Sequence, residues 1–161
     1  MKTENVHQYV EDFGVLFEQF GLSRMVGRLL AWLLICEPPH QTMPEMVEAL
    51  GTSKSSISTT VRSLEQLDLI ERISLPGIRA DYFRLKSNVW IRLIESKLSQ
   101  FSVLRHFAER GLDLLEGEPP ARRQSLEHMQ AAMIFFEREF SDLLERWKAE
   151  QATDGSSDDR R

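Results

Sequence analysis

The feature that most constrains the fold of this chain is a pair of short helices joined by a glycine turn, between residues 42 and 67. Thr42 is followed three residues later by Glu45, which is the spacing of a capping box that satisfies free backbone amides at a helix start. Gly51 supplies the left-handed conformation that ends this first helix. Ser53 is then a good N-cap for a second helix. The pattern is typical of a helix-turn-helix.

The second helix has one apolar face and one polar face. Ile57, Val61 and Leu64 recur at spacings of four and three, so we expect them on one buried stripe. The opposite face carries small hydroxyl side chains and two cations, which can approach base edges and phosphates without steric bulk. The candidate DNA-binding residues here are Ser53, Ser55, Ser56, Ser58 and Thr59, near base edges, and Lys54 and Arg62, nearer phosphates.

A basic hairpin follows the second helix. Two short segments, 71–75 and 80–85, are joined by Pro76-Gly77-Ile78-Arg79, which predicts a two-stranded wing. We expect Arg79 at its tip to enter a minor groove or to hold a phosphate. Arg28, on the preceding helix, is a weaker candidate for the flanking DNA backbone, and a structural ion pair is the alternative.

The distribution of charge agrees with this interpretation better than the total does. The chain of 161 residues has a formal net charge of −5, which by itself argues against nucleic acid. Residues 52–86, however, hold six cations and four acids, a local charge of +2. Residues 1–20 and 87–150 carry −3 and −2. A locally basic segment on an acidic body is compatible with DNA binding.

A second interpretation stays open. Helix-turn-helix patterns also occur in proteins that never touch DNA, and a serine-rich helix start is common. The alternative is a winged-helix interaction module whose acidic body docks a protein partner, with the polar helix face only solvated.

Three stretches resemble MarR-type regulators, and the GbsR-like branch is the closest fit. They are Gly27-Arg28-Leu29-Leu30-Ala31-Trp32-Leu33-Leu34, then Ala49-Leu50-Gly51-Thr52-Ser53-Lys54-Ser55-Ser56-Ile57-Ser58, then Leu64-Glu65 with Leu67, Leu69 and Ile70. The resemblance covers about residues 20 to 86. It implies a winged-helix transcriptional regulator whose terminal helices form a dimer, and in some GbsR-like proteins a quaternary ammonium effector.

Helices outside the winged motif share a repeat of apolar residues with gaps of three and four, which indicates seams facing other helices. The seams are Val6, Tyr9, Phe13, Leu16 and Phe20; Ile91, Ile94, Leu98, Phe101, Arg105, Ala108, Leu112 and Leu115; and Leu126, Met129, Met133, Phe136, Phe140, Leu143 and Trp147. Gly117 to Pro120 break the last two helices into a hairpin. These stripes exceed what one small winged motif can cover, which favours a homodimer. An intramolecular bundle is the alternative.

The sequence therefore predicts a mainly helical, α+β winged-helix fold in four parts. Residues 1–21 form an N-terminal dimerisation helix, 22–86 the DNA-binding domain, 87–150 a dimerisation hairpin, and 151–161 a disordered tail. The predicted function is sequence-specific binding of double-stranded DNA by a homodimer at a pseudo-palindromic operator.

The sequence offers no residues for catalysis. It has no nucleophile elbow, phosphate-binding loop or dinucleotide fingerprint, so we expect no enzyme activity and no cofactor. The four histidines are scattered, and His106 with Glu109 alone cannot make a metal site. Cys36 is expected to be a small buried hydrophobe. The chain has a single cysteine and shows no signal or membrane segment, and we therefore expect a cytoplasmic protein.

The aromatic residues allow two interpretations. Trp32, Trp90, Phe101, Phe107, Phe135, Phe136, Phe140 and Trp147 could line a pocket for an aromatic or quaternary ammonium effector. Packing of the core and of a dimer is the favoured interpretation, and the effector is kept as a second possibility.

Overall fold

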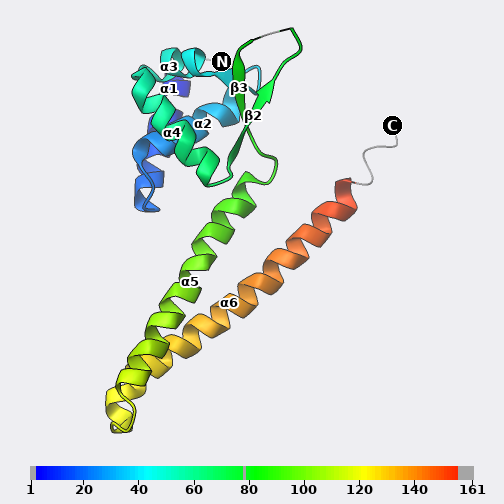
Figure 1. The fold of residues 1–161 in the computed structure, drawn as a ribbon. Helices are drawn as coiled ribbons and strands as arrows, with labels where there is room; N and C mark the ends of the chain where they lie inside the picture. The colour runs from blue at the N-terminus through cyan, green and yellow to red at the C-terminus, as the bar shows by residue number, and fades with distance from the viewer. Residues whose placement is uncertain (1–2, 78, 156–161) are drawn as a thin grey trace. The chain divides into compact units, whose positions relative to one another are not determined.

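The computed structural model describes residues 3–77 and 79–155, which form helices and a small sheet (Figure 1). The elements are α1 (Thr3–Gln19), α2 (Arg24–Ile35), β1 (Gln41–Thr42), α3 (Met43–Leu50), α4 (Lys54–Gln66), β2 (Ile70–Ser74), β3 (Asp81–Leu85), α5 (Val89–Leu114) and α6 (Pro120–Gly155). The chain divides into two compact units, Met1–Arg92 and Leu93–Arg161. The expectation of a mainly helical winged-helix fold is confirmed.

The predicted helix caps are present at α3 and α4. The Glu45 carboxylate accepts a hydrogen bond from the Thr42 amide at 2.6 Å, and Thr42 Oγ1 accepts one from the Glu45 amide at 3.4 Å. The bond from the Thr42 amide, and a second one from the Thr42 hydroxyl to the same carboxylate at 2.7 Å, lower the pKa of Glu45, the backbone bond contributing most. Gly51 has a φ of 56°, and Ser53 Oγ accepts from the Ser56 amide at 3.2 Å. The turn is therefore built by local hydrogen bonds that the sequence pattern identified.

The apolar stripe of α4 is fully buried, as its spacing predicted. Ile57, Val61 and Leu64 have no exposed surface, and the core of this unit also contains Leu29 and Phe83, from α2 and β3. A helix of this length is marginal alone in water, so packing of this stripe supplies most of its stability. Burial of one face fixes the rotation of α4 and turns its polar face outward.

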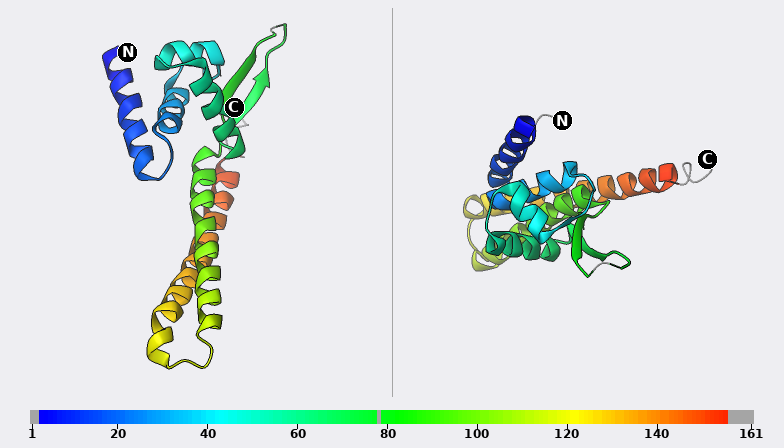
Figure 2. Two further views of the ribbon diagram at one scale, coloured as in Figure 1. Left: turned by 60° about the vertical axis from the view of Figure 1, so that its left-hand side comes forward. Right: turned by 90° about the horizontal axis from the view of Figure 1, so that it is seen from above.

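The wing is a hairpin of β2 and β3 that projects beyond the helices of its unit (Figure 2). The strands pair antiparallel, with Arg72 opposite Phe83. A third strand, β1, pairs with β3 on its other side, giving the order β1-β3-β2 instead of the expected two strands. Strand β1 is only two residues long, which is too short to show an alternating apolar and polar pattern, so it could not be predicted from the sequence. Ile78, in the predicted turn, lies outside the described residues.

Helix α1 packs on α2 through two glycines. A Cβ on Gly27 would lie 2.7 Å from Phe17 Cβ and 2.9 Å from Gly14 Cα, so the helices cross almost backbone to backbone. Glu11 adds ion pairs to Arg24 and Arg28. The structure therefore places α1 in the same unit as the winged motif.

The second unit contains most of α5 and all of α6, an antiparallel hairpin that turns between Leu114 and Pro120 as predicted. Phe101 stacks on Phe136 and Phe140, with ring centroids 5.8 and 6.1 Å apart. Arg105, the polar member of the α5 seam, donates to Glu137 at 3.1 Å and to Glu109 at 2.6 Å. Part of the predicted seam is thus used within one chain.

The end of α6 corrects one boundary. The helix continues through Gly155, so residues 151–155 are helical and do not belong to the expected disordered tail. Residues 156–161, the rest of that tail, lie outside the described part of the chain.

The helix crossing generates a stability prediction. Gly27→Ala should lower the free energy of unfolding by about 1–3 kcal/mol, because its methyl group would overlap backbone and Cβ atoms of α1. Gly111→Ala is the control, since its nearest atom is the mobile end of Leu126 and alanine favours helix. Urea unfolding measures both. Equal stability of the two variants would contradict a close α1–α2 crossing.

Candidate nucleic-acid interface

The predicted DNA-binding residues of α4 lie together on its outward face. Ser55 and Thr59 are exposed and Ser56 is half-buried, and all three line a shallow hollow of about 390 Å³. Ser23 and Met25, at the start of α2, line the same hollow. Ser23 was not among the predicted DNA-binding residues, because nothing local in the sequence links it to α4. The hollow presents hydroxyl groups of two helices beside the candidate surface.

Most cations of the winged unit have acidic partners. The pairs are Arg24 and Arg28 with Glu11, Arg72 with Glu65 and Asp81, Arg84 with Glu71, and Lys86 and Arg92 with Asp68. Within the described residues up to 92, Lys54, Arg62 and Arg79 are the cations without an ion pair. Arg62 makes only a bond to Ser58 Oγ at 3.2 Å. The cations left free are therefore the three that the sequence assigned to phosphates and the wing tip.

Arg28 has partners inside the protein. Its Nη2 donates to the Leu50 carbonyl oxygen at 2.7 Å, and its Nε lies 2.7 Å from Glu11 Oε1. The side chain is 20% exposed. Arg28 thus holds the carboxyl end of α3 against α2, in keeping with the structural alternative, and its contact with the DNA backbone stays a prediction.

Arg72 links the wing to α4, a role that the sequence did not reveal. Its guanidinium lies over the Phe83 ring at 5.4 Å and forms ion pairs with Asp81 on β3, at 3.3 Å, and Glu65 on α4, at 3.7 Å. These contacts join the two elements that carry the free cations.

The other reactive groups show no chemistry of a catalytic site. Cys36 is 7% exposed, and burial raises the pKa of its thiol from 9.0 to about 11. His106 is largely exposed, and Glu109 beside it is bonded to Arg105. No cluster of three metal-ligating side chains occurs among the described residues. Nor does any helix in that part of the chain have the length and apolar character needed to cross a bilayer.

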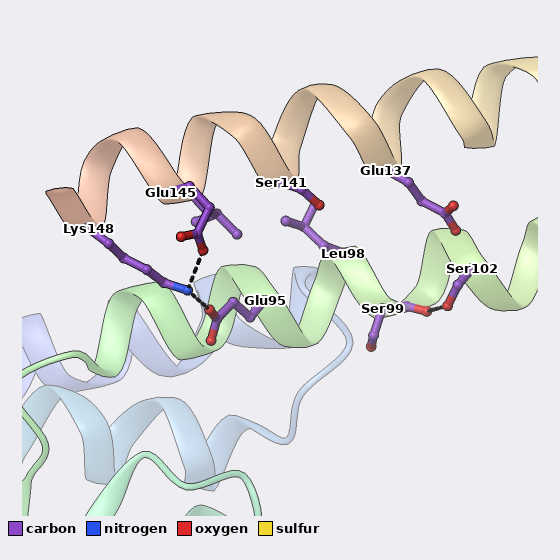
Figure 3. Close-up of a pocket in the computed structure, with 9 residues that line it drawn as sticks. Glu95, Leu98, Ser99, Ser102, Glu137, Ser141, Glu145 and Lys148 are labelled. Carbon is purple, nitrogen blue, oxygen red and sulfur yellow. Dashed lines mark hydrogen bonds and ion pairs between the residues drawn. The ribbon is translucent and has the colours of Figure 1, made fainter.

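A polar groove of about 470 Å³ lies between α5 and α6 (Figure 3). Lys148 Nζ sits between Glu95 and Glu145, at 3.0 and 3.2 Å from their carboxylate oxygens. Three serines, Glu137 and two leucines, Leu98 and Leu144, line the remainder, and no aromatic ring does. The groove does not match the aromatic effector pocket considered from the sequence.

A helix-turn-helix of α3 and α4, with a polar outward face on α4 and a basic-tipped wing after it, defines the class of winged helix-turn-helix regulators. Two family models agree with this class: residues 88–150 match an MmpR5-like MarR family transcriptional regulator, and residues 20–77 match the MarR family. The chain belongs to the MarR family of transcriptional regulators. These are DNA-binding regulators and not enzymes.

Two similar proteins span nearly the whole chain, and a third spans about half of it. The HTH-type transcriptional regulator MmpR5 of Mycobacterium tuberculosis (strain ATCC 25618 / H37Rv) is 35% identical over 150 residues, covering 93% of this chain and 91% of that protein. A solved crystal structure of a transcriptional regulator superposes with a TM-score of 0.76 and 36% identity, covering 90% of this chain and 99% of the other. The putative HTH-type transcriptional regulator YvaV of Bacillus subtilis (strain 168) is 27% identical over 82 residues, 51% of this chain and 46% of that protein.

The buried thiol generates a prediction about reactivity. Because the pKa of Cys36 is raised to about 11, the thiol is protonated at pH 8, and a thiol-specific reagent should modify it only after unfolding. The raised pKa favours folding below pH 9, and this contribution is lost as the pH rises toward 11. Absorbance of released thionitrobenzoate measures the reaction. Rapid labelling of the native protein would contradict the burial of this thiol.

Proposed function

We propose that this MarR-family regulator binds double-stranded DNA sequence-specifically as a homodimer at a pseudo-palindromic operator. The observation that carries the proposal is the position of the free cations. Lys54, Arg62 and Arg79 lack acidic partners within the described residues, and they flank the hydroxyl face of α4 and the wing tip. Phosphate contacts from such cations supply affinity, and short polar side chains between them read base edges.

Within this proposal the amino-terminal half of α4 enters a major groove. Ser55, Ser56, Ser58 and Thr59 approach bases, while Lys54 and Arg62 bind phosphates. Arg79 adds affinity from the wing, where a narrow minor groove attracts an arginine through its negative potential.

Dimerisation is supported by apolar side chains that the single chain leaves uncovered. Of the described side chains in the second unit, only Ala108 and Leu144 are buried. The large apolar side chains that are exposed in this unit are Ile94, Val103, Leu104, Phe107, Leu114, Ile134, Phe135, Phe136, Leu143 and Trp147. A twofold partner covers such faces with the same faces of its own. Tyr9 and Leu16 leave a similar exposed face on α1, and Phe20 is exposed just after this helix.

Two finer assignments complete the proposal. The resemblance of the residues around Gly27 and Gly51 to the GbsR-like branch supports the first, that the chain is a member of that branch. An aromatic or quaternary ammonium effector would bind where exposed rings such as Phe107, Phe135 and Trp147 gather in the assembled dimer.

Removing a free cation tests the proposed DNA surface. Arg62→Ala and Arg79→Gln should each weaken binding to the operator and flatten the salt dependence by about one counterion. Arg84→Gln is the matched control: it removes the same charge from the wing, but from a cation held by Glu71 at 2.6 Å. Fluorescence anisotropy with a selected duplex measures affinity and slope. If Arg84→Gln reduced the slope as much as Arg79→Gln, net charge and not the free cations would explain binding.

Introducing a charge on the exposed face tests the dimer. Phe107 is 58% exposed, with the Arg110 guanidinium 5.7 Å from its ring and no aromatic partner among the described residues, so Phe107→Asp should leave a folded monomer. In a dimer it would bury a carboxylate in an apolar interface, and dissociation with loss of operator binding is expected. Gln100→Asp, at another exposed site of α5, is the control. Light scattering of both variants gives the mass, and a monomeric parent that still binds the operator would contradict the dimer.

A further inference from the structure

Asp68 ends the DNA-reading helix in an unusual backbone conformation. Its φ of 57° lies in the left-handed region, which glycine adopts readily and aspartate occasionally. The Asp68 amide bonds to the Glu65 carbonyl at 3.0 Å, and the Leu69 amide bonds to the Leu64 carbonyl at 2.9 Å. These bonds close α4 in the way a glycine would, yet the residue carries a carboxylate.

The two oxygens of that carboxylate bind two different cations. Oδ1 accepts from Lys86, which follows β3, and Oδ2 lies 2.6 Å from Nη1 of Arg92, in the first turn of α5. The backbone reinforces the link, since the Lys86 amide donates to the Leu69 carbonyl at 3.0 Å. The hydrogen bond from Lys86 lowers the pKa of Asp68, so the carboxylate is ionised at neutral pH.

We propose that Asp68 is a positioning residue for DNA binding, which fixes the end of α4 to the start of α5 through Lys86 and Arg92. The proposal rests on the proposed function of α4. The apolar stripe sets the rotation of α4, but apolar contacts are not directional. Charge-assisted hydrogen bonds are directional, so they define where the helix end lies.

The same contact links the end of α4 to the first turn of α5. α5 is one helix from Val89 to Leu114, and residues from Leu93 onward belong to the second unit. Asp68 therefore joins α4 to the helix that continues into the proposed dimerisation unit.

A positioning role and a simple effect of charge predict opposite changes in operator affinity when Asp68 is replaced. Asp68 is acidic, so by charge alone its removal should strengthen binding to any duplex, since it frees two cations. If Asp68 positions α4, its removal should weaken binding to the operator while binding to unrelated duplex stays equal or rises.

Asp68→Asn makes this test, because asparagine tolerates the same backbone conformation and has nearly the same shape, while it removes the charge and one of the two acceptor oxygens. We expect operator affinity to fall about five- to tenfold, with an unchanged salt slope. Glu118→Gln removes one charge from another exposed ion pair, with Arg122, and should change neither. Operator binding by Asp68→Asn as tight as the parent's, or tighter, would overturn the proposal.

A double-mutant cycle isolates the contact. Arg92→Gln leaves the backbone of Asp68 untouched and should lower operator affinity similarly, and the double variant should lose little more than either single one. Fully additive losses of operator affinity would mean that Asp68 and Arg92 act independently, and would overturn the proposal. Thermal unfolding of each variant shows whether the winged unit stays folded. If the parent shows no preference for a selected operator, the proposed function fails. If the parent binds the operator but the variants do not lose affinity as expected, only the inference about Asp68 fails.

Discussion

The complete burial of one stripe of α4 is the constraint on which the rest of this structure depends. Ile57, Val61 and Leu64 are fully enclosed by the core of the first unit, and a helix of 13 residues has little stability without such packing. Because successive residues of a helix are separated by about 100°, burying these three dictates which others face solvent. Lys54 and Arg62 point outward as a consequence of the core.

A second constraint comes from ion pairing in an acidic chain. The formal charge is −5, and acids of the winged unit neutralise most of its cations. Arg72 is held by Glu65 and Asp81, which ties the wing to α4 instead of leaving another positive charge free. Affinity for DNA depends on cations free to release counterions. The pairing pattern therefore concentrates positive charge on a small surface of a protein that is negative as a whole.

Local signals in the sequence were sufficient for the caps, the stripe of α4 and the wing, since each depends on residues close in the chain. The features that were missed depend on distant partners. Strand β1 exists only because β3 lies beside it, and Gly27 matters only where α1 crosses. Arg105 breaks the apolar repeat because Glu137, 32 residues away, pairs with it. For the candidate site, the face of α4 followed from periodicity, whereas Arg72 and Asp68 needed three-dimensional contacts to be found.

Hydrogen exchange of the native chain with and without a selected operator duplex tests the central claim most directly. The account predicts that, at low salt, exchange slows in α4 and in the β2–β3 hairpin, and that this protection disappears at high salt or with a scrambled duplex. Unchanged exchange in α4 and the hairpin, with the operator bound and protection confined to α5 and α6, would contradict it.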